Sequence, residues 1–170
     1  MKENFDLSFH ALLKHEGGFV MHPKDPGGMT NLGVTKSAWE DYVGHAVDEA
    51  QMRALTPDTV MPFYRSRYWN AVGGDSLPGG VDYCVFDCAV NSGPRQAIKF
   101  LQRAVKVTDD GILGIGTRTA VANTDPRLIV SRLTASRLDF LQKLPTFTTF
   151  GKGWVRRVRE VETLANSLIL

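Results

Sequence analysis

The stretch KHEGGFVMHPKDPGGMTNLGVT occupies residues 14–35 and separates two kinds of local structure. Before it, the apolar residues of 5–16 recur at the spacing of a helix with one buried face, and Gly17-Gly18 is typical of a helix C-terminus. We therefore expect the first helix to end at Glu16. Residues 17–34 have many glycines and prolines and no helical period, so they predict an irregular loop that could include a short hairpin.

Beyond this loop the chain has the pattern of short helices separated by glycine and proline. The helices are predicted at residues 35–43, 48–55, 56–69 and 81–90, after Gly93, after Thr117, from Asp125 to Pro145, and at 154–168, with a linker at 145–153. The expected fold class is mainly α, a single domain of about eight helices in which the loop after the first helix is the exception.

Composition narrows the class of protein. With 43% hydrophobic and 22% charged residues in 170, the chain can fold around a core, which excludes disorder. Its apolar runs are much shorter than the ~18 residues of a membrane span. Acidic residues occur near the start, where an export signal would be apolar, so we expect synthesis in the host cytoplasm without an ordinary signal peptide.

The net charge of +2 hides an asymmetry between the two ends of the chain. Residues 1–126 carry 12 basic and 15 acidic side chains, whereas residues 127–170 carry 8 basic and 3 acidic ones. The last predicted helix is amphipathic and contains Arg156, Arg157 and Arg159. It could pack on the domain or contact a membrane, and a basic end could also face nucleic acid or an acidic wall polymer.

Cysteine and histidine spacings give no sign of a metal site. Cys84 and Cys88 lie four residues apart in a predicted helix and are expected to be reduced core thiols. The four histidines show no ligand spacing, so we expect no metal and no other cofactor.

Two acidic residues flank the glycine-rich loop. Glu16 continues the apolar face of the first helix at its negative end, and both conditions favour the protonated acid. Asp25 lies among glycines, where backbone amides can keep a carboxylate charged. Such a pair can cleave a glycosidic bond, with Thr30 or Thr35 positioning water. The alternative is an ordinary helix end followed by an ordinary turn.

Several separated motifs in this order resemble glycoside hydrolase family 108, the lysozyme-like N-acetylmuramidases of phages and prophages. They are Glu16-Gly17-Gly18-Phe19, Asp25-Pro26-Gly27-Gly28, Thr30-Asn31-Leu32-Gly33-Val34-Thr35, Phe63-Tyr64-Arg65-Ser66-Arg67-Tyr68-Trp69, Phe86-Asp87-Cys88-Ala89-Val90-Asn91-Ser92-Gly93, Asp109-Asp110-Gly111-Ile112-Leu113-Gly114 and Gly151-Lys152-Gly153-Trp154. The resemblance covers nearly the whole chain. It implies a lysozyme-like endolysin that cuts the β-1,4 bond between N-acetylmuramic acid and N-acetylglucosamine in peptidoglycan.

The resemblance also assigns catalytic roles to individual residues. The family's acidic residue falls on Glu16, and the Glu-x8-Asp-x5-Thr spacing of more distant phage lysozymes places the second carboxylate at Asp25. Only four residues separate Asp25 from Thr30, so Asn31 and Thr35 remain alternatives to Thr30. Whether hydrolysis inverts or retains configuration depends on the distance between the two carboxyl groups.

Further residues are candidates for holding sugar. Tyr68 or Trp69 could stack on a sugar ring, although a tryptophan at this spacing is often a core residue. Asn91 could bind an N-acetyl group, or it could simply end a helix.

The stretch Asp110-Gly111-Ile112-Leu113-Gly114-Ile115-Gly116-Thr117 resembles the turn of helical peptidoglycan-binding modules, or it is a plain glycine turn with a threonine cap. We expect a catalytic region at 1–92 and a helical region at 93–170 that carries this turn, both packed as one compact unit. The expected protein is a monomer that a holin releases to the periplasm and that binds peptidoglycan rather than nucleic acid. The rival readings are a non-catalytic wall-binding or secretion-assisting protein and a metal-dependent amidase.

Overall fold

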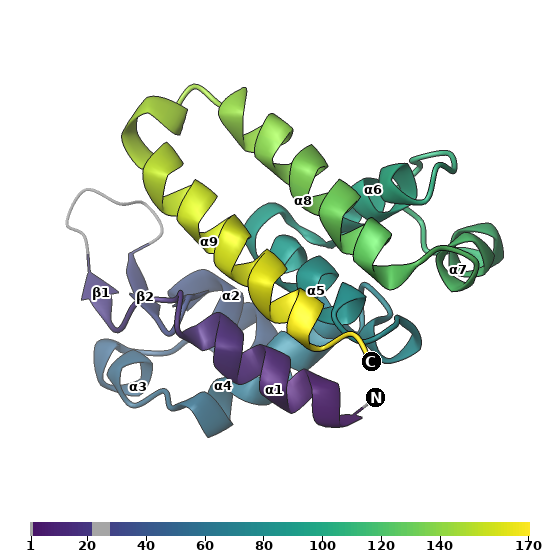
Figure 1. Cartoon of the computed structure of the whole chain (residues 1–170). Helices are drawn as coiled ribbons and strands as arrows, with labels where there is room; N and C mark the ends of the chain where they lie inside the picture. Colours follow the sequence, from purple (N-terminus) through teal and green to yellow (C-terminus); the bar gives the residue numbers. More distant parts are fainter. Residues whose placement is uncertain (1, 22–27) are drawn as a thin grey trace. The chain divides into compact units, whose positions relative to one another are not determined.

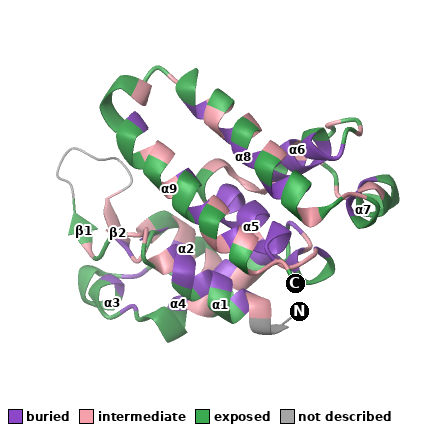
Figure 2. Cartoon of the chain, viewed as in Figure 1, coloured by how far each residue is buried: buried purple, intermediate pink, exposed green. Residues whose placement is uncertain are grey.

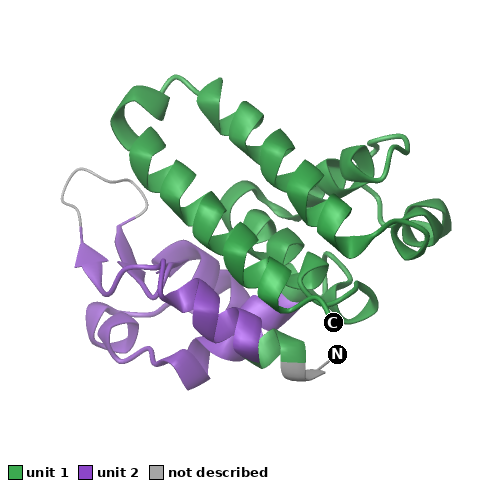
Figure 3. Ribbon diagram, in the orientation of Figure 1, with its two compact units in different colours: residues 1–6, 68–170 green, residues 7–67 purple. Residues whose placement is uncertain are grey.

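The structure is a computed structural model that describes residues 2–21 and 28–170 (Figure 1). It is mainly helical, as predicted. The chain divides into two compact units (Figure 3): Leu7–Arg67 forms one, and Met1–Asp6 with Tyr68–Leu170 forms the other. We call them the small and the large unit. This division reflects packing, because the helices Val81–Ser92 and Pro94–Ala104 contact each other within the large unit. The functional boundary expected after residue 92 stays a prediction.

The small unit contains most of helix α1 (Lys2–Leu13) and a three-stranded sheet. Its further elements are β1 (Val20–Met21), β2 (Met29–Asn31), β3 (Val34–Thr35), α2 (Lys36–Val43), α3 (Glu49–Arg53) and α4 (Pro57–Tyr64). The strands are antiparallel in the order β1-β2-β3, which confirms that the Gly/Pro-rich segment includes a hairpin.

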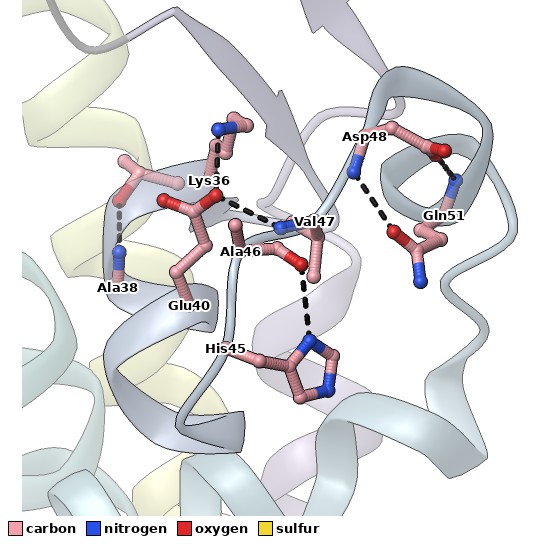
Figure 4. A network of polar contacts seen from close by, with 9 residues as sticks. Lys36, Ala38, Glu40, His45, Ala46, Val47, Asp48 and Gln51 are labelled. Atoms are coloured by element: carbon pink, nitrogen blue, oxygen red, sulfur yellow. Dashed lines mark hydrogen bonds and ion pairs between the residues drawn. The ribbon is translucent and has the colours of Figure 1, made fainter.

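Side-chain caps explain why the helices of the small unit begin where the sequence predicts. The Thr35 hydroxyl accepts a hydrogen bond from the Ala38 amide at the start of α2. Asp48 and Gln51 cap α3 reciprocally, and their two hydrogen bonds are drawn in Figure 4. Each cap satisfies amides that the first turn of a helix leaves without a partner.

Glu40 fixes the connection between α2 and α3. Its Oε1 accepts hydrogen bonds from Lys36 Nζ at 2.6 Å and from the Val47 amide at 2.9 Å (Figure 4). These two hydrogen bonds lower the pKa of Glu40, and the bond from Lys36 has the larger effect. The carboxylate therefore stays charged near neutral pH and holds the connecting segment against α2.

The large unit is built around one buried helix. Its elements are the π-helical turn η1 (Arg65–Trp69), which begins in the small unit, followed by η2 (Gly74–Ser76), α5 (Val81–Ser92), α6 (Pro94–Ala104), α7 (Ile115–Ala122), α8 (Pro126–Gln142) and α9 (Phe147–Ser167). Every residue of 81–89 is buried (Figure 2). Helices α6, α8 and α9 all contact α5, so α5 forms the centre of the core.

A buried ionic cluster joins three of these helices. Asp87 of α5 accepts a hydrogen bond at Oδ2 from Arg137 Nη1 of α8 at 2.6 Å. Its Oδ1 accepts two from Arg157 of α9, from Nη2 at 2.9 Å and from Nε at 3.0 Å. Burial disfavours the charge of Asp87, but the two guanidinium groups outweigh this effect and lower its pKa. The carboxylate is thus held ionised inside the core.

The two cysteines are free and buried on α5, which confirms the prediction of reduced core thiols. Burial raises the pKa of Cys84 to about 12 and that of Cys88 to about 11, so neither forms a reactive thiolate at neutral pH. Among the described residues, no helix combines the length and the apolar character that crossing a membrane requires.

The linker predicted at 145–153 is wrong from residue 147 onward, because α9 begins at Phe147 rather than at Trp154. Glycine and threonine are poor helix formers, which is why the sequence indicated a break. In the structure Gly151 is buried beneath the Phe147 ring, and a Cβ at Gly151 would lie 2.7 Å from that ring. The small residue thus leaves room for the ring of Phe147, one turn earlier in the same helix.

Candidate active site

Glu16 lies just beyond the C-terminus of α1. The helix ends at Leu13, three residues earlier than predicted. The next three amides, of Lys14, His15 and Glu16, bond to the carbonyls three residues before them. Such bonds tighten the final turn of a helix into a 3₁₀ geometry. Glu16 is half-buried, so it sits at the surface of the small unit rather than in its core.

The Glu16 carboxyl group and the Tyr64 hydroxyl group converge on Gly33. A Cβ added to Gly33 would lie 2.7 Å from Glu16 Oε2 and 2.5 Å from Tyr64 Oη. Gly33 has a φ of +76°, and the preceding Leu32 has a φ of +50°, so both lie in the left-handed region. They form the two-residue connection between β2 and β3, where such angles match the twist of the hairpin. The turn is therefore shaped to leave space for the carboxyl group.

Tyr64 is a positioning residue that sequence analysis missed. Its side chain is fully buried against Phe9 and Phe63, and its Oη donates a 2.8 Å hydrogen bond to the Leu32 carbonyl. A buried tyrosine needs a partner for its hydroxyl group. The sequence signal was the hydroxyl group itself. Tyr64 follows Phe63 in a predicted helix, and a phenylalanine would fill the core there without needing a hydrogen-bond partner.

Thr30 and Thr35 lie opposite each other on neighbouring strands. The register of β2 and β3 pairs these two residues, and their side chains therefore share one face of the sheet. Thr30 is half-buried, while the exposed Thr35 accepts the helix-capping bond from Ala38. Thr35 thus has a structural role, which leaves Thr30 as the threonine more available for a water molecule.

The prediction that Asn31 could take the place of Thr30 is wrong. Its side chain is 5% exposed, and its Nδ2 donates a 2.9 Å hydrogen bond to the Met52 carbonyl. Because successive side chains of a strand point to opposite faces, Asn31 faces α3 while Thr30 faces the other way. The amide ties the sheet to α3 and is not presented to a ligand. Asp25 falls outside the described residues.

Three predicted sugar-binding residues belong to the large unit. Trp69 is fully buried, contacts the rings of Phe5 and Phe86, and donates from Nε1 to Asp75 at 2.9 Å. The prediction that Trp69 stacks on sugar is therefore wrong, since neither face of its indole ring is open. Tyr68 is half-buried and Asn91 is exposed near the end of α5, so both remain candidates.

The glycine turn after α6 is organised by one buried amide. Gln102 Nε2 donates to Asp110 Oδ1, to the Ile112 carbonyl and to Thr117 Oγ1, and its Oε1 accepts from the Gly111 amide. Gln102 is 1% exposed; its bond to Thr117 is buried and the other three are partly buried. Within the described residues, no group of three or more histidine, cysteine or acidic side chains could hold a metal ion.

Comparisons with known proteins place the chain in a family. Residues 9–93 match the family model described as Glycosyl hydrolase 108, and this segment contains Glu16, Gly33 and Tyr64. The chain belongs to this family. Residues 96–159 match a second model, described as Predicted Peptidoglycan domain, which contains the Gln102 turn. Together they identify a glycoside hydrolase that acts on peptidoglycan.

A solved structure is similar over almost the full length. SagA of Brucella abortus has 42% sequence identity and a TM-score of 0.88, and the match covers 99% of this chain and 97% of that one. A comparison with curated proteins finds no match. The predicted resemblance to family 108 is thus confirmed by the family match.

Proposed function

We propose that the protein is an N-acetylmuramidase that hydrolyses the β-1,4 bond between N-acetylmuramic acid and N-acetylglucosamine, with Glu16 as the general acid. The observation that carries this proposal is the placement of the Glu16 carboxyl group against Gly33, beside the buried Tyr64 hydroxyl. A general acid must be held in one orientation to protonate a leaving oxygen. The tightened turn after α1 and the packing against Gly33 both restrict the side chain.

The chemistry follows from two carboxyl groups with different tasks. Glu16 donates its proton to the glycosidic oxygen as the bond to the anomeric carbon breaks. The second carboxylate, assigned to Asp25 by the spacing of the motif, either activates water or attacks the anomeric carbon. Thr30, which lies on strand β2, positions the water molecule that the second carboxylate activates. We further propose that this reaction takes place on the cell wall in the periplasm.

The decisive experiment is mass spectrometry of purified peptidoglycan after digestion. We expect products with reducing-end muramic acid. Reducing-end glucosamine or an anhydro sugar would contradict the bond assignment, and chelator-sensitive release of stem peptide would identify an amidase instead. An unchanged substrate would indicate a non-catalytic wall-binding protein.

The role of Glu16 is tested by substitution. Glu16→Gln keeps the size of the side chain but removes the proton, so we expect the rate to fall on the order of 10²–10⁴-fold. The matched control is Glu49→Gln, in which the lost acid lies in an exposed ion pair with Arg53. This control should keep wild-type activity, because exposed pairs contribute little stability. Equal activity of the Glu16→Gln variant and the control would refute the assignment.

A further inference from the structure

The three strands of the small unit place Val20, Thr30 and Thr35 in one row. Val20 of β1 pairs with Thr30 of β2, and Thr30 pairs with Thr35 of β3. Paired residues of antiparallel strands point to the same face of a sheet, with Cβ atoms about 5 Å apart. The Val20 side chain therefore lies beside the threonine that positions water in the proposed function. We call these three residues the Val20 row.

The other face of the sheet is turned toward α3. Asn31 on that face donates a hydrogen bond to the Met52 carbonyl of α3, and its cross-strand partner Val34 is 1% exposed. Phe19, which precedes β1, also contacts α3, because Arg53 Cζ lies 3.9 Å from its ring centroid. The Val20 row points the opposite way, since side chains alternate along a strand. It therefore lies on the face that α3 does not cover.

The Val20 row presents methyl groups next to hydroxyl groups at the surface of the small unit. Val20 is 54% exposed, Thr35 is exposed and Thr30 is half-buried, and Figure 2 shows β1 as an exposed strand. A single exposed valine is common on protein surfaces and does not by itself indicate a ligand. Val20 is informative because of its place, directly opposite the water-positioning threonine.

We propose that Val20 is a specificity-determining residue, which packs against the acetyl methyl group of the muramic acid whose glycosidic bond is cut. The inference rests on the proposed function, in which the water near Thr30 reacts at the anomeric carbon of that sugar. The 2-acetamido group is attached to the ring carbon next to the anomeric carbon. Its methyl group is therefore within reach of a side chain one strand away from Thr30.

The chemistry of the alternative sugar explains the selectivity. A de-N-acetylated muramic acid carries an ammonium group at this position, and an aliphatic side chain cannot replace the water that solvates the charge. The sugar would also lose the apolar contact with Val20. The 3-O-lactyl group of muramic acid ends in a methyl group as well, but it is attached one carbon farther from the anomeric carbon. The acetyl group is therefore the partner that the geometry favours.

The test uses peptide-free glycan strands in which part of the muramic acid has been de-N-acetylated. Each cut by an N-acetylmuramidase leaves the sugar from the reacting position as the new reducing end, so mass spectrometry shows whether that sugar was acetylated. We expect the wild-type protein to cut preferentially at N-acetylated muramic acid. Val20→Thr exchanges one methyl group for a hydroxyl group and should reduce this preference about fivefold.

Met21→Gln is the matched control. Met21 is the next residue of β1 and is also 54% exposed, but it points to the other face of the sheet. Both substitutions replace an apolar side chain by a polar one of similar size on the same strand. Met21→Gln should keep the wild-type preference. Thermal unfolding should show that both variants remain folded.

The ratio of the two kinds of product separates recognition from a structural effect. If Val20 only stabilised the sheet, Val20→Thr would slow both cuts equally and leave the ratio unchanged. The inference is overturned by that result, by equal cutting of both sugars in the wild-type protein, or by an equal shift in Met21→Gln. The proposed function is judged separately, because it fails if the wild-type products do not end in muramic acid.

Discussion

Tyr64 Oη donates a hydrogen bond of 2.8 Å to the Leu32 carbonyl and thereby ties α4 to the turn between β2 and β3. Leu32 has a φ of +50°, which is unfavourable for a residue with a branched side chain. The hydrogen bond holds this backbone in place, and the adjacent Gly33 faces the Glu16 carboxyl group. The geometry around the proposed acid thus depends on a tyrosine 48 positions away in the sequence.

Tyr64→Phe should lower activity about tenfold and stability by about 1 kcal/mol, since one buried hydrogen bond is lost without a change in packing. Peptidoglycan turbidity and thermal unfolding measure the two effects. Tyr42→Phe is the control, because it removes a hydroxyl from a half-buried tyrosine of the same unit. If Tyr64→Phe loses stability but keeps full activity, Tyr64 does not position the acid.

Gly33→Ala tests the space around Glu16 by comparison with Gly44→Ala. Both glycines have positive φ, of +76° and +80°, so both substitutions should cost about 1–2 kcal/mol of backbone strain. A Cβ at Gly44 meets nothing within 4 Å, whereas one at Gly33 displaces Glu16 and Tyr64. We expect Gly33→Ala to lose more stability than Gly44→Ala, because it also displaces the buried Tyr64, and we expect a loss of activity only for Gly33→Ala, measured by the same two assays. Equal activity of the two variants would contradict the proposed site.

Local patterns predicted part of this site, and long-range contacts determined the rest. The caps at Thr35 and Asp48 were predicted because they depend on neighbours within three residues. The burial of Trp69 and the role of Tyr64 were not predicted, because each depends on partners far along the chain. Periodicity shows that a residue faces the core, but it does not show which side chain keeps an open face.

Asp87→Asn should destabilise the large unit by about 3–5 kcal/mol, because it leaves Arg137 and Arg157 without their buried counter-charge. The folded-state pKa of Asp87 is lowered, so its contribution is present above the unfolded value of about 3.9 and is lost as the pH falls through the folded pKa. The free energy of unfolding, measured by chemical denaturation from neutral pH to pH values below about 4, tests both expectations.

Asp82→Asn is the matched control for the pH dependence. Asp82 is also buried on α5, but burial raises its pKa. The pH dependence of its contribution to stability therefore has the opposite sign to that of Asp87. The acid-induced loss of stability should be reduced in Asp87→Asn and should persist in Asp82→Asn. A wild-type acid profile in Asp87→Asn would mean that the ionic cluster does not govern acid unfolding.

Gln102→Glu should loosen the glycine turn while the shape of the side chain is retained. The amide Nε2 donates three hydrogen bonds, and an ionised carboxylate can donate none. It would also face the Asp110 carboxylate, whose pKa is lowered first by the bond from Gln102 and then by that from the Ile112 amide. We expect a loss of about 2–3 kcal/mol and faster amide hydrogen exchange at residues 110–117. Gln96→Glu, at a half-buried position of the same helix, is the control. Unchanged exchange at 110–117 would show that the backbone alone fixes this turn.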